Sequence, residues 1–263
     1  MKSIILAAGE GKRLRPLTSS LPKSMIDIFG IPLLQRQINT MKECGIKDII
    51  VITGYKSELI NIPGVTYRTN QNYDTTNMVE TLFCAKDDLE DDTIISYADI
   101  LFEKKVLKNL MKSNHDMSIV IDLNWKEYWD KRFDNPLDDA ETLKINSEGN
   151  IVEIGQKPKN IEEINGQYIG LMKFNSDGLK VMKNFYEKCK SESRNGTNPL
   201  NPKIVFEKSY MTDLLQGLIN NSNELKPIFT NGHWIEIDSM QDYELIHKMF
   251  NENKLTDIIN LDN

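Results

Sequence analysis

Residues 3–18 read Ser-Ile-Ile-Leu-Ala-Ala-Gly-Glu-Gly-Lys-Arg-Leu-Arg-Pro-Leu-Thr, and Pro22-Lys23 follows shortly after. The continuous apolar run from Ser3 to Ala8 is typical of a strand that is buried on both faces of a parallel sheet. Gly9 and Gly11 follow it directly. Glycines after a first strand let the backbone approach a phosphate closely, and backbone N–H groups in such a turn bind anions. This stretch therefore predicts a phosphate-binding loop at the carboxyl end of a buried first strand.

Apolar runs that predict strands alternate with helical patterns over the first 122 residues. The stretch 33–44 is an example of the helical pattern, because its apolar residues share one stripe and Gly45 follows as a stop signal. Such alternation predicts right-handed βαβ units and a parallel sheet with helices on both faces. The other strands predicted here are 48–53, 65–69, 93–97 and 117–122, and the other helices are 78–85 and 104–111.

The pattern changes after residue 122. Residues 125–137 are aromatic and charged without a clear period, whereas 143–145 and 151–154 flank a polar turn and predict a hairpin. We expect one α/β domain, with a Rossmann-like, mostly parallel sheet flanked by helices and a small β-rich insertion. The later predicted strands are 168–174 and 228–237, and the later helices are 179–189, 211–218 and 243–250.

Composition and charge limit the classes of protein that fit. Hydrophobic residues make up 40% of the chain and charged residues 27%, which is typical of a globular domain. A formal net charge of -7 argues against a nucleic-acid-binding surface. No apolar run approaches the ~20 residues of a membrane span, and the apolar run at the N-terminus is too short for a signal peptide. We therefore expect a cytoplasmic protein without a nucleic-acid or membrane partner.

Three classes of phosphate-binding motif compete for the glycine loop. A dinucleotide fingerprint requires a third glycine where Leu14 stands, and a Walker A loop requires a glycine where Leu6 stands. The third class is the signature L-A-A-G-x-G-x-R-L-x-P-L-T followed by P-K, and this sequence matches it throughout. The chain thus resembles the nucleotidyltransferase family that includes sugar-1-phosphate nucleotidylyltransferases and phosphocholine cytidylyltransferases.

Later landmarks of the family occur in the same order. They are Asn77-Met78, Asp99, Gln156-Lys157-Pro158, Gly166 with Gly170, and Glu236-Ile237-Asp238. Within the family, residues 95–100 and 129–144 are similar to the CTP:phosphoglutamine cytidylyltransferases, which act in making the phosphoramidate decoration of bacterial capsules. The resemblance implies a GT-A-like nucleotidyltransferase fold over 1–263. It divides the chain into a nucleotide-binding half (1–122), a half with the acceptor site and second metal ligand (123–240) and a C-terminal helix (241–263).

The resemblance also assigns the nucleotide and metal sites. Arg13 is expected to hold the β- and γ-phosphates with its planar fork, and Lys23 to stabilise the α-phosphate as a point charge. Asp99 and Asp238 are expected to share one Mg²⁺, although aspartates at strand ends are often helix caps. Asn77 suits both base recognition and plain helix capping. The expected nucleotide-binding residues are Leu6, Ala7, Ala8, Gly9, Gly11, Lys23, Tyr73, Asn77 and Ala98.

Acceptor residues are expected mainly in the second half. Trp129 and Trp234 are candidates for an aromatic face against a cationic group, with core packing as the alternative. Asp139 and Glu141 are candidates for an acceptor ammonium, with a solvated turn as the alternative. By the same resemblance, Lys157 contacts the acceptor phosphate. Arg132 and Glu236 complete the set, the first for an acceptor carboxylate and the second because strand alternation turns it away from its neighbours.

The sequence therefore predicts a Mg²⁺-dependent enzyme that transfers CMP from CTP to a small phosphorylated amine or amino acid and releases pyrophosphate. Phosphoglutamine is the first candidate acceptor and phosphocholine or a similar aminoalkyl phosphate the second. A sugar 1-phosphate nucleotidylyltransferase keeps the same fold. A non-catalytic nucleotide-binding subunit is a further alternative, but it should have lost Lys23, Arg13 or an aspartate. A homodimer is compatible with the sequence.

Overall fold

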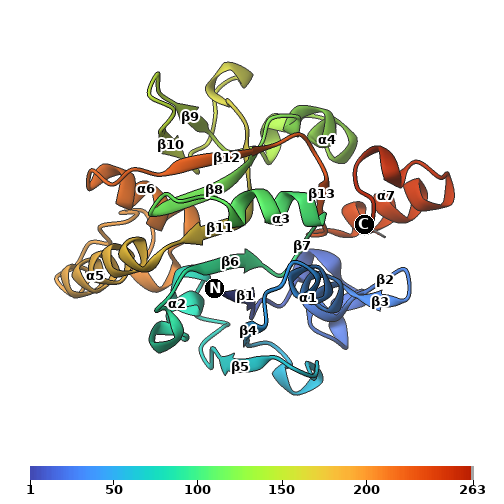
Figure 1. The fold of residues 1–263 in the computed structure, drawn as a ribbon, viewed down its shortest axis with the longest axis horizontal. Helices are drawn as coiled ribbons and strands as arrows, with labels where there is room; N and C mark the ends of the chain where they lie inside the picture. The colour runs from blue at the N-terminus through green and yellow to red at the C-terminus, as the bar shows by residue number, and fades with distance from the viewer. Residues whose placement is uncertain (262–263) are drawn as a thin grey trace.

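Seven strands form the central sheet in the order β12-β8-β11-β6-β1-β4-β5 in a computed structural model that describes residues 1–261 (Figure 1). All neighbours pair in parallel except β11, which runs antiparallel between β6 and β8. The mostly parallel sheet predicted from the alternating pattern is therefore confirmed. The strands are β1 Lys2–Ala7, β4 Asp48–Thr53, β5 Thr66–Thr69, β6 Thr93–Tyr97, β8 Met117–Asp122, β11 Gln167–Phe174 and β12 Lys226–Thr230.

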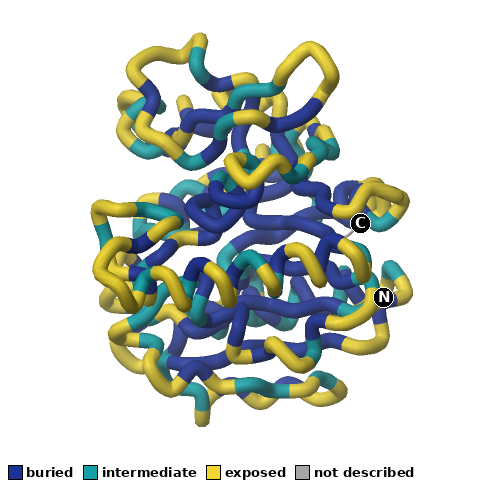
Figure 2. Tube along the Cα trace, turned by 90° about the vertical axis from the view of Figure 1, so that its left-hand side faces the viewer, coloured by how far each residue is buried: buried dark blue, intermediate teal, exposed yellow. Residues whose placement is uncertain are grey.

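Both faces of the sheet are buried. Along β1, Ile5 belongs to one hydrophobic cluster, whereas Ile4 and Leu6 belong to the cluster on the opposite face. Successive side chains of a strand point to opposite faces, so a strand that is covered on both sides needs apolar residues at every position. Figure 2 shows this buried layer in the middle of the molecule with exposed segments outside it.

The helices cover the two faces in separate groups. Buried residues of α1, α3, α4 and α7 join the cluster that contains Ile5, and those of α2, α5 and α6 join the cluster that contains Ile4. The helices are α1 Leu33–Glu43, α2 Met78–Phe83, α3 Lys104–Met111, α4 Trp125–Arg132, α5 Ser176–Ser193, α6 Met211–Asn220 and α7 Met240–Asn251. None of the helices within residues 1–261 is long and apolar enough to cross a membrane.

Within residues 1–261, three two-stranded pairs lie outside the main sheet. The predicted hairpin is present as β9 Leu143–Ile145 and β10 Ile151–Ile154, and a short hairpin joins β2 Asp27–Ile28 to β3 Ile31–Pro32. The third pair joins β7 Ile100–Phe102 to β13 Trp234–Glu236 in antiparallel orientation. This last pair brings a late segment of the chain next to the carboxyl end of β6.

The structure corrects three sequence expectations. Residues 125–132 form α4 although their sequence shows no clear helical period. Residues 228–237 do not form one strand, because Gly232 and His233 adopt left-handed backbone with φ of 73° and 66° and separate β12 from β13. The closing helix expected over 241–263 ends at Asn251, and Asn253 with φ of 58° follows it in the left-handed conformation that commonly ends helices.

Candidate active site

A cavity of about 600 Å³ opens at the carboxyl ends of β1 and β6, the edge at which open α/β sheets bind ligands. All nine residues expected to bind the nucleotide line it, and so do Arg13 and both candidate metal ligands. The lining residues are Leu6, Ala7, Ala8, Gly9, Glu10, Gly11, Lys12, Arg13, Lys23, Ser24, Tyr73, Asp74, Thr76, Asn77, Met78, Thr81, Tyr97, Ala98, Asp99, Lys208, Tyr210 and Asp238.

The glycine loop lies directly against Lys23. Gly11 has a left-handed φ of 64°, and its carbonyl accepts hydrogen bonds from the Thr18 hydroxyl at 2.8 Å and from the Leu14 amide at 2.9 Å. A Cβ atom at Gly11 would lie 2.8 Å from the Cβ of Lys23. Both the backbone conformation and the space therefore require glycine, which ties the shape of the loop to the position of Lys23.

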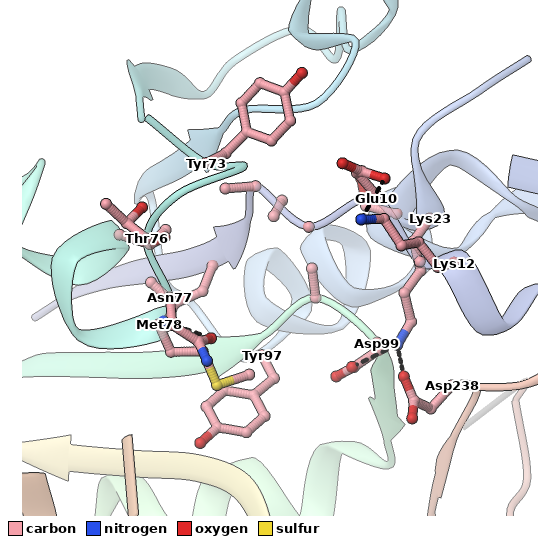
Figure 3. A pocket seen from close by; sticks show the side chains of 18 of the residues that line it. Glu10, Lys12, Lys23, Tyr73, Thr76, Asn77, Met78, Tyr97, Asp99 and Asp238 are labelled. Atoms are coloured by element: carbon pink, nitrogen blue, oxygen red, sulfur yellow. Dashed lines mark hydrogen bonds and ion pairs between the residues drawn. The ribbon is translucent and has the colours of Figure 1, made fainter. Parts of the chain in front are cut away.

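Lys23 lies between the two aspartates (Figure 3). Its Nζ atom is 2.7 Å from Oδ2 of Asp99 and 2.5 Å from Oδ1 of Asp238, while Arg13 forms an ion pair with the other oxygen of Asp238. Burial lowers the pKa of Lys23, but the attraction of Asp99 and Asp238 outweighs it and raises that pKa to about 12. The lysine is therefore protonated at neutral pH, and the two carboxylates converge on one point.

The pairing of β7 with β13 explains why these carboxylates meet. Asp99 follows β6 closely and directly precedes β7, and Asp238 comes two residues after the end of β13. Beyond the strand pair, the Ile237 amide donates a hydrogen bond to the Asp99 carbonyl at 2.9 Å. Two residues that are far apart in the sequence are thereby joined through neighbouring backbone.

The pair of aspartates fits a divalent metal. Oδ1 of Asp99 is buried and accepts no hydrogen bond from any described residue, so it has an unused lone pair inside the site. No group of three or more His, Cys, Asp or Glu side chains within residues 1–261 is arranged to hold a metal. Hard divalent cations in phosphate-transferring sites need one or two carboxylates, because phosphate oxygens and waters supply the other ligands.

The opposite end of the cavity is built around the start of α2 (Figure 3). The Asn77 side chain accepts a hydrogen bond from the Met78 amide at 2.8 Å and donates one to the Lys208 carbonyl at 3.3 Å. Asn77 thus caps the helix and lines the cavity at once, so its two possible roles are compatible. Tyr73 lines the same end.

Several lining residues were not predicted from the sequence. Glu10 and Lys12 lie within the signature, and the 71% exposed side chain of Lys12 lines the cavity beside Glu10. Lys208 and Tyr210 come from a loop that carries no recognisable pattern. Tyr97 is the last residue of a predicted strand, so its position at the carboxyl edge was the one signal available for it.

None of the seven expected acceptor residues lines the cavity. Trp129 and Trp234 are 4% and 1% exposed, and their indole nitrogens donate to Asp139 at 3.1 Å and to Asp122 at 2.8 Å. This corrects the expectation of an open aromatic face, since core packing accounts for both rings. Arg132 is likewise corrected, because its buried guanidinium is paired with protein carboxylates and has no open side for an acceptor.

Lys157 also lies elsewhere than expected. Its ammonium donates to the carbonyls of Leu137 and Asp138, and Lys157 does not line the cavity. Glu236 turns away from buried Ile235 and Ile237, as strand alternation predicted, and forms an ion pair with Arg132 at 2.8 Å. The nucleotide and metal candidates therefore line the cavity, whereas the acceptor candidates do not.

An acidic region lies beside Tyr97. Glu141 is solvent-exposed, but desolvation by nearby protein and repulsion from Asp139 and Asp213 raise its pKa to about 7. Burial and the charge of Glu141 also raise the pKa of the Tyr97 and Tyr168 hydroxyls, whose rings meet edge to face with centroids 5.8 Å apart. Carboxylates and tyrosine rings are thus gathered near Asp99.

Comparison with known proteins identifies the class. Residues 3–167 match the MobA-like NTP transferase domain, and the chain belongs to this family of nucleotidyltransferases. Such enzymes generally use a divalent metal, which agrees with the paired aspartates.

One relative matches over nearly its whole length. The chain is 40% identical to the CTP:phosphoglutamine cytidylyltransferase of Campylobacter jejuni over 256 residues, which cover 93% of this chain and 98% of the relative. It is 37% identical to the choline-phosphate cytidylyltransferase of Streptococcus pneumoniae over 119 residues, 44% of this chain and 52% of that one.

Solved structures confirm the fold. A CTP:phosphocholine cytidylyltransferase from Streptococcus pneumoniae superimposes with a TM-score of 0.69 at 23% identity, covering 95% of this chain and 98% of the other. An inositol-1-phosphate CTP transferase from T. maritima gives a TM-score of 0.68 at 20% identity, covering 98% and 97%.

The contact between Gly11 and Lys23 leads to a first prediction. Gly11→Ala should lower kcat/KM for the nucleoside triphosphate by roughly tenfold or more, because the added methyl group must displace Lys23. Gly30→Ala is the matched control: Gly30 also has positive φ, at 83°, but nothing lies within 4 Å of the position that an added methyl group would take. Both variants should lose about 1–2 kcal/mol of stability from backbone strain. Equal kinetic losses in the two variants would contradict the proposed packing role.

Proposed function

We propose that this protein transfers CMP from CTP to a small phosphorylated amine or amino acid, with phosphoglutamine as the first candidate acceptor. The observation that carries the proposal is the Lys23 ammonium held between Asp99 and Asp238 at the ligand-binding edge of the sheet. The 40% identity to a CTP:phosphoglutamine cytidylyltransferase along nearly the full length of both chains supports the choice of nucleotide and acceptor.

The reaction joins two anions and therefore depends on positive charge. An oxygen of the acceptor phosphate attacks the α-phosphorus of CTP, the bond from that phosphorus to the bridging oxygen of the β-phosphate breaks, and pyrophosphate leaves. The phosphoryl group of the acceptor is already an anion at neutral pH, so its oxygen needs no strong general base. In-line positioning and neutralisation of the crowded charge are the main requirements.

The chain supplies that positive charge from the loop and its surroundings. Backbone N–H groups near Gly9 and Gly11 are available to the triphosphate, and Arg13 has the fork that binds two phosphate oxygens together. Lys23 provides a compact charge for the α-phosphate, where charge accumulates as the new bond forms. When Mg²⁺ is bound by Asp99 and Asp238, it adds neutralisation of phosphate oxygens.

The acidic region beside Tyr97 supports an acceptor with an ammonium group. Asp139 and Asp213 lie close enough to Glu141 to repel charge on its carboxylate, so three acidic side chains are grouped there. A neutral sugar ring gains nothing from such a region, whereas the α-ammonium of phosphoglutamine is attracted to it. The rings of Tyr97 and Tyr168 would also suit the trimethylammonium group of phosphocholine, which makes phosphocholine the second candidate.

The most direct test measures pyrophosphate release with purified protein and Mg²⁺. Each of the four nucleoside triphosphates is combined with phosphoglutamine, phosphocholine and glucose 1-phosphate. We expect turnover with CTP and an amino-containing acceptor. Turnover restricted to glucose 1-phosphate would identify a sugar nucleotidylyltransferase, and no turnover with any pair would favour a regulatory nucleotide-binding protein.

Removal of charge at the metal end gives the second prediction. Lys23→Ala and Asp99→Ala should each lower kcat at least about 100-fold, because each removes a group expected to act on the reacting phosphates. Arg15→Ala is the control, since Arg15 belongs to the same signature but pairs with Glu10 at 3.5 Å and does not line the cavity. Steady-state kinetics are measured on variants whose thermal melts show a folded protein. Near-normal rates for Lys23→Ala or Asp99→Ala would overturn the role proposed for that residue.

The acidic region gives the third prediction. Glu141→Gln should raise KM for phosphoglutamine about tenfold, the loss equivalent to one partly desolvated charge interaction of ~1.4 kcal/mol. KM for CTP should not change. Glu148→Gln, in the exposed turn between β9 and β10, is the control. A larger change in KM for CTP than in KM for the acceptor would contradict the assignment of Glu141 to the acceptor.

The pKa of Glu141 adds a fourth prediction. This carboxyl is mostly neutral below pH 7 and mostly charged above it, because its pKa is about 7. KM for phosphoglutamine should therefore rise as pH falls from 8 to 6. The acceptor phosphate also titrates near the low end of this range, so the wild-type profile is compared with that of Glu141→Gln. Identical pH profiles of KM in wild type and Glu141→Gln would rule out Glu141 as the cause of the rise in KM.

A further inference from the structure

Arg132 at the end of α4 connects two carboxylates on either side of Asp238. It is 2% exposed, and its guanidinium lies 2.8 Å from Oε2 of Glu236 and 2.8 Å from Oδ1 of Asp242. Its Nη2 atom donates a second hydrogen bond to Asp242 at 3.2 Å. The side chain is therefore fixed by one residue just before Asp238 and another just after it.

Asp242 in turn holds the backbone of Asp238. Its Oδ2 atom accepts hydrogen bonds from the Asp238 amide at 3.0 Å, the Ser239 amide at 2.9 Å and the Ser239 hydroxyl at 3.0 Å. Ser239 is the N-cap of α7, and Asp242 at the third helical position accepts from its amide in a capping box while also accepting from the Asp238 amide just before the helix. A continuous chain of contacts thus leads from Arg132 through Asp242 to the residue that faces Lys23.

Aromatic packing on α4 limits the freedom of Arg132. The guanidinium lies 5.3, 5.1 and 5.0 Å from the ring centres of Tyr128, Trp129 and Phe133. The Tyr128 hydroxyl also bonds to the backbone of Glu236, donating to its carbonyl at 3.2 Å and accepting from its amide at 3.1 Å. Helix α4 is therefore attached to the segment 236–242 through side chains on two successive turns.

We infer that Arg132 is a positioning residue that sets the location of Asp238 as a metal ligand, acting through Asp242 and Glu236. This inference rests on the proposed metal role of Asp99 and Asp238. Without the guanidinium, two neighbouring carboxylates would lose their shared counter-charge in a buried setting, and the capped backbone at Asp238 would relax. Groups that orient metal ligands in this way typically change metal affinity about 10- to 100-fold when they are removed.

The first measurement needs no metal. Amide hydrogen exchange is followed by NMR at Asp238 and Ser239 in wild type, Arg132→Met and Asp242→Asn. Both variants should exchange at least about tenfold faster at these two amides, because the side chain at position 242 that accepts their hydrogen bonds is no longer held by Arg132. Unchanged exchange at both amides in Arg132→Met would overturn the inference.

The second measurement is Mn²⁺ affinity by electron paramagnetic resonance in the presence of a non-hydrolysable CTP analogue. Arg132→Met and Asp242→Asn should each weaken Mn²⁺ binding about tenfold. The double variant should be hardly weaker than either single variant, because both act through the same contact. Wild-type affinity in a folded Arg132→Met, or additive losses in the double variant, would overturn the inference.

Two further variants separate positioning from general stability. Lys173→Met removes another buried cation, which bonds to the carbonyls of Met111 and Ser113 away from the cavity, and should lower stability without changing Mn²⁺ affinity. If Arg132→Met does not fold, Arg132→Lys, which keeps the charge but lacks the fork, should show the same direction of change. Wild-type protein that binds no Mn²⁺ would instead overturn the metal role itself, whereas the exchange measurement is independent of that role.

Discussion

The organisation of this site depends on the repulsion between Asp99 and Asp238, two carboxylates held at one point inside the protein. Two carboxylates held close together destabilise a partly buried site unless a cation lies between them. In the structure Lys23 provides that cation, with Arg13 beside it. The same arrangement explains the chemistry, because charges that neutralise two aspartates are also suited to phosphates, and the aspartates are suited to a divalent metal.

The fold meets this constraint with backbone contacts as well as side chains. The pairing of β7 with β13, together with the hydrogen bond from Ile237 to Asp99, fixes the spacing of the two acidic residues. The left-handed turn at Gly11 leaves room for Lys23 to reach them. An exposed loop could not hold like charges together in this way, since it would move them apart into water.

The segment 125–144 has a different relation to the site than its composition suggested. Trp129 and Arg132 have the features of ligand-binding residues, namely an aromatic face and a forked cation. The Arg132 guanidinium instead packs on the Trp129 ring and pairs with Glu236 and Asp242. Asp139 and Glu141 come from the same segment, and the charge of Glu141 acts on Tyr97, which lines the cavity. One short segment therefore contacts the backbone and side chains around Asp238 through its buried residues, and its acidic residues are the ones proposed to attract the acceptor.

The sequence alone determined the βαβ units near the N-terminus, the glycine loop and the set of predicted nucleotide and metal residues that line one cavity. These features depend on local signals: apolar runs, glycines and the fixed spacing of Gly9, Arg13 and Lys23. Only the tertiary structure decided the antiparallel β11, the break between β12 and β13, the entry of Lys208 and Tyr210 into the cavity, and the burial of Trp129 and Arg132. The physical reason is that an indole or guanidinium has the same chemistry in a core as in a binding site, and which of the two it joins depends on contacts between segments that are distant in the chain.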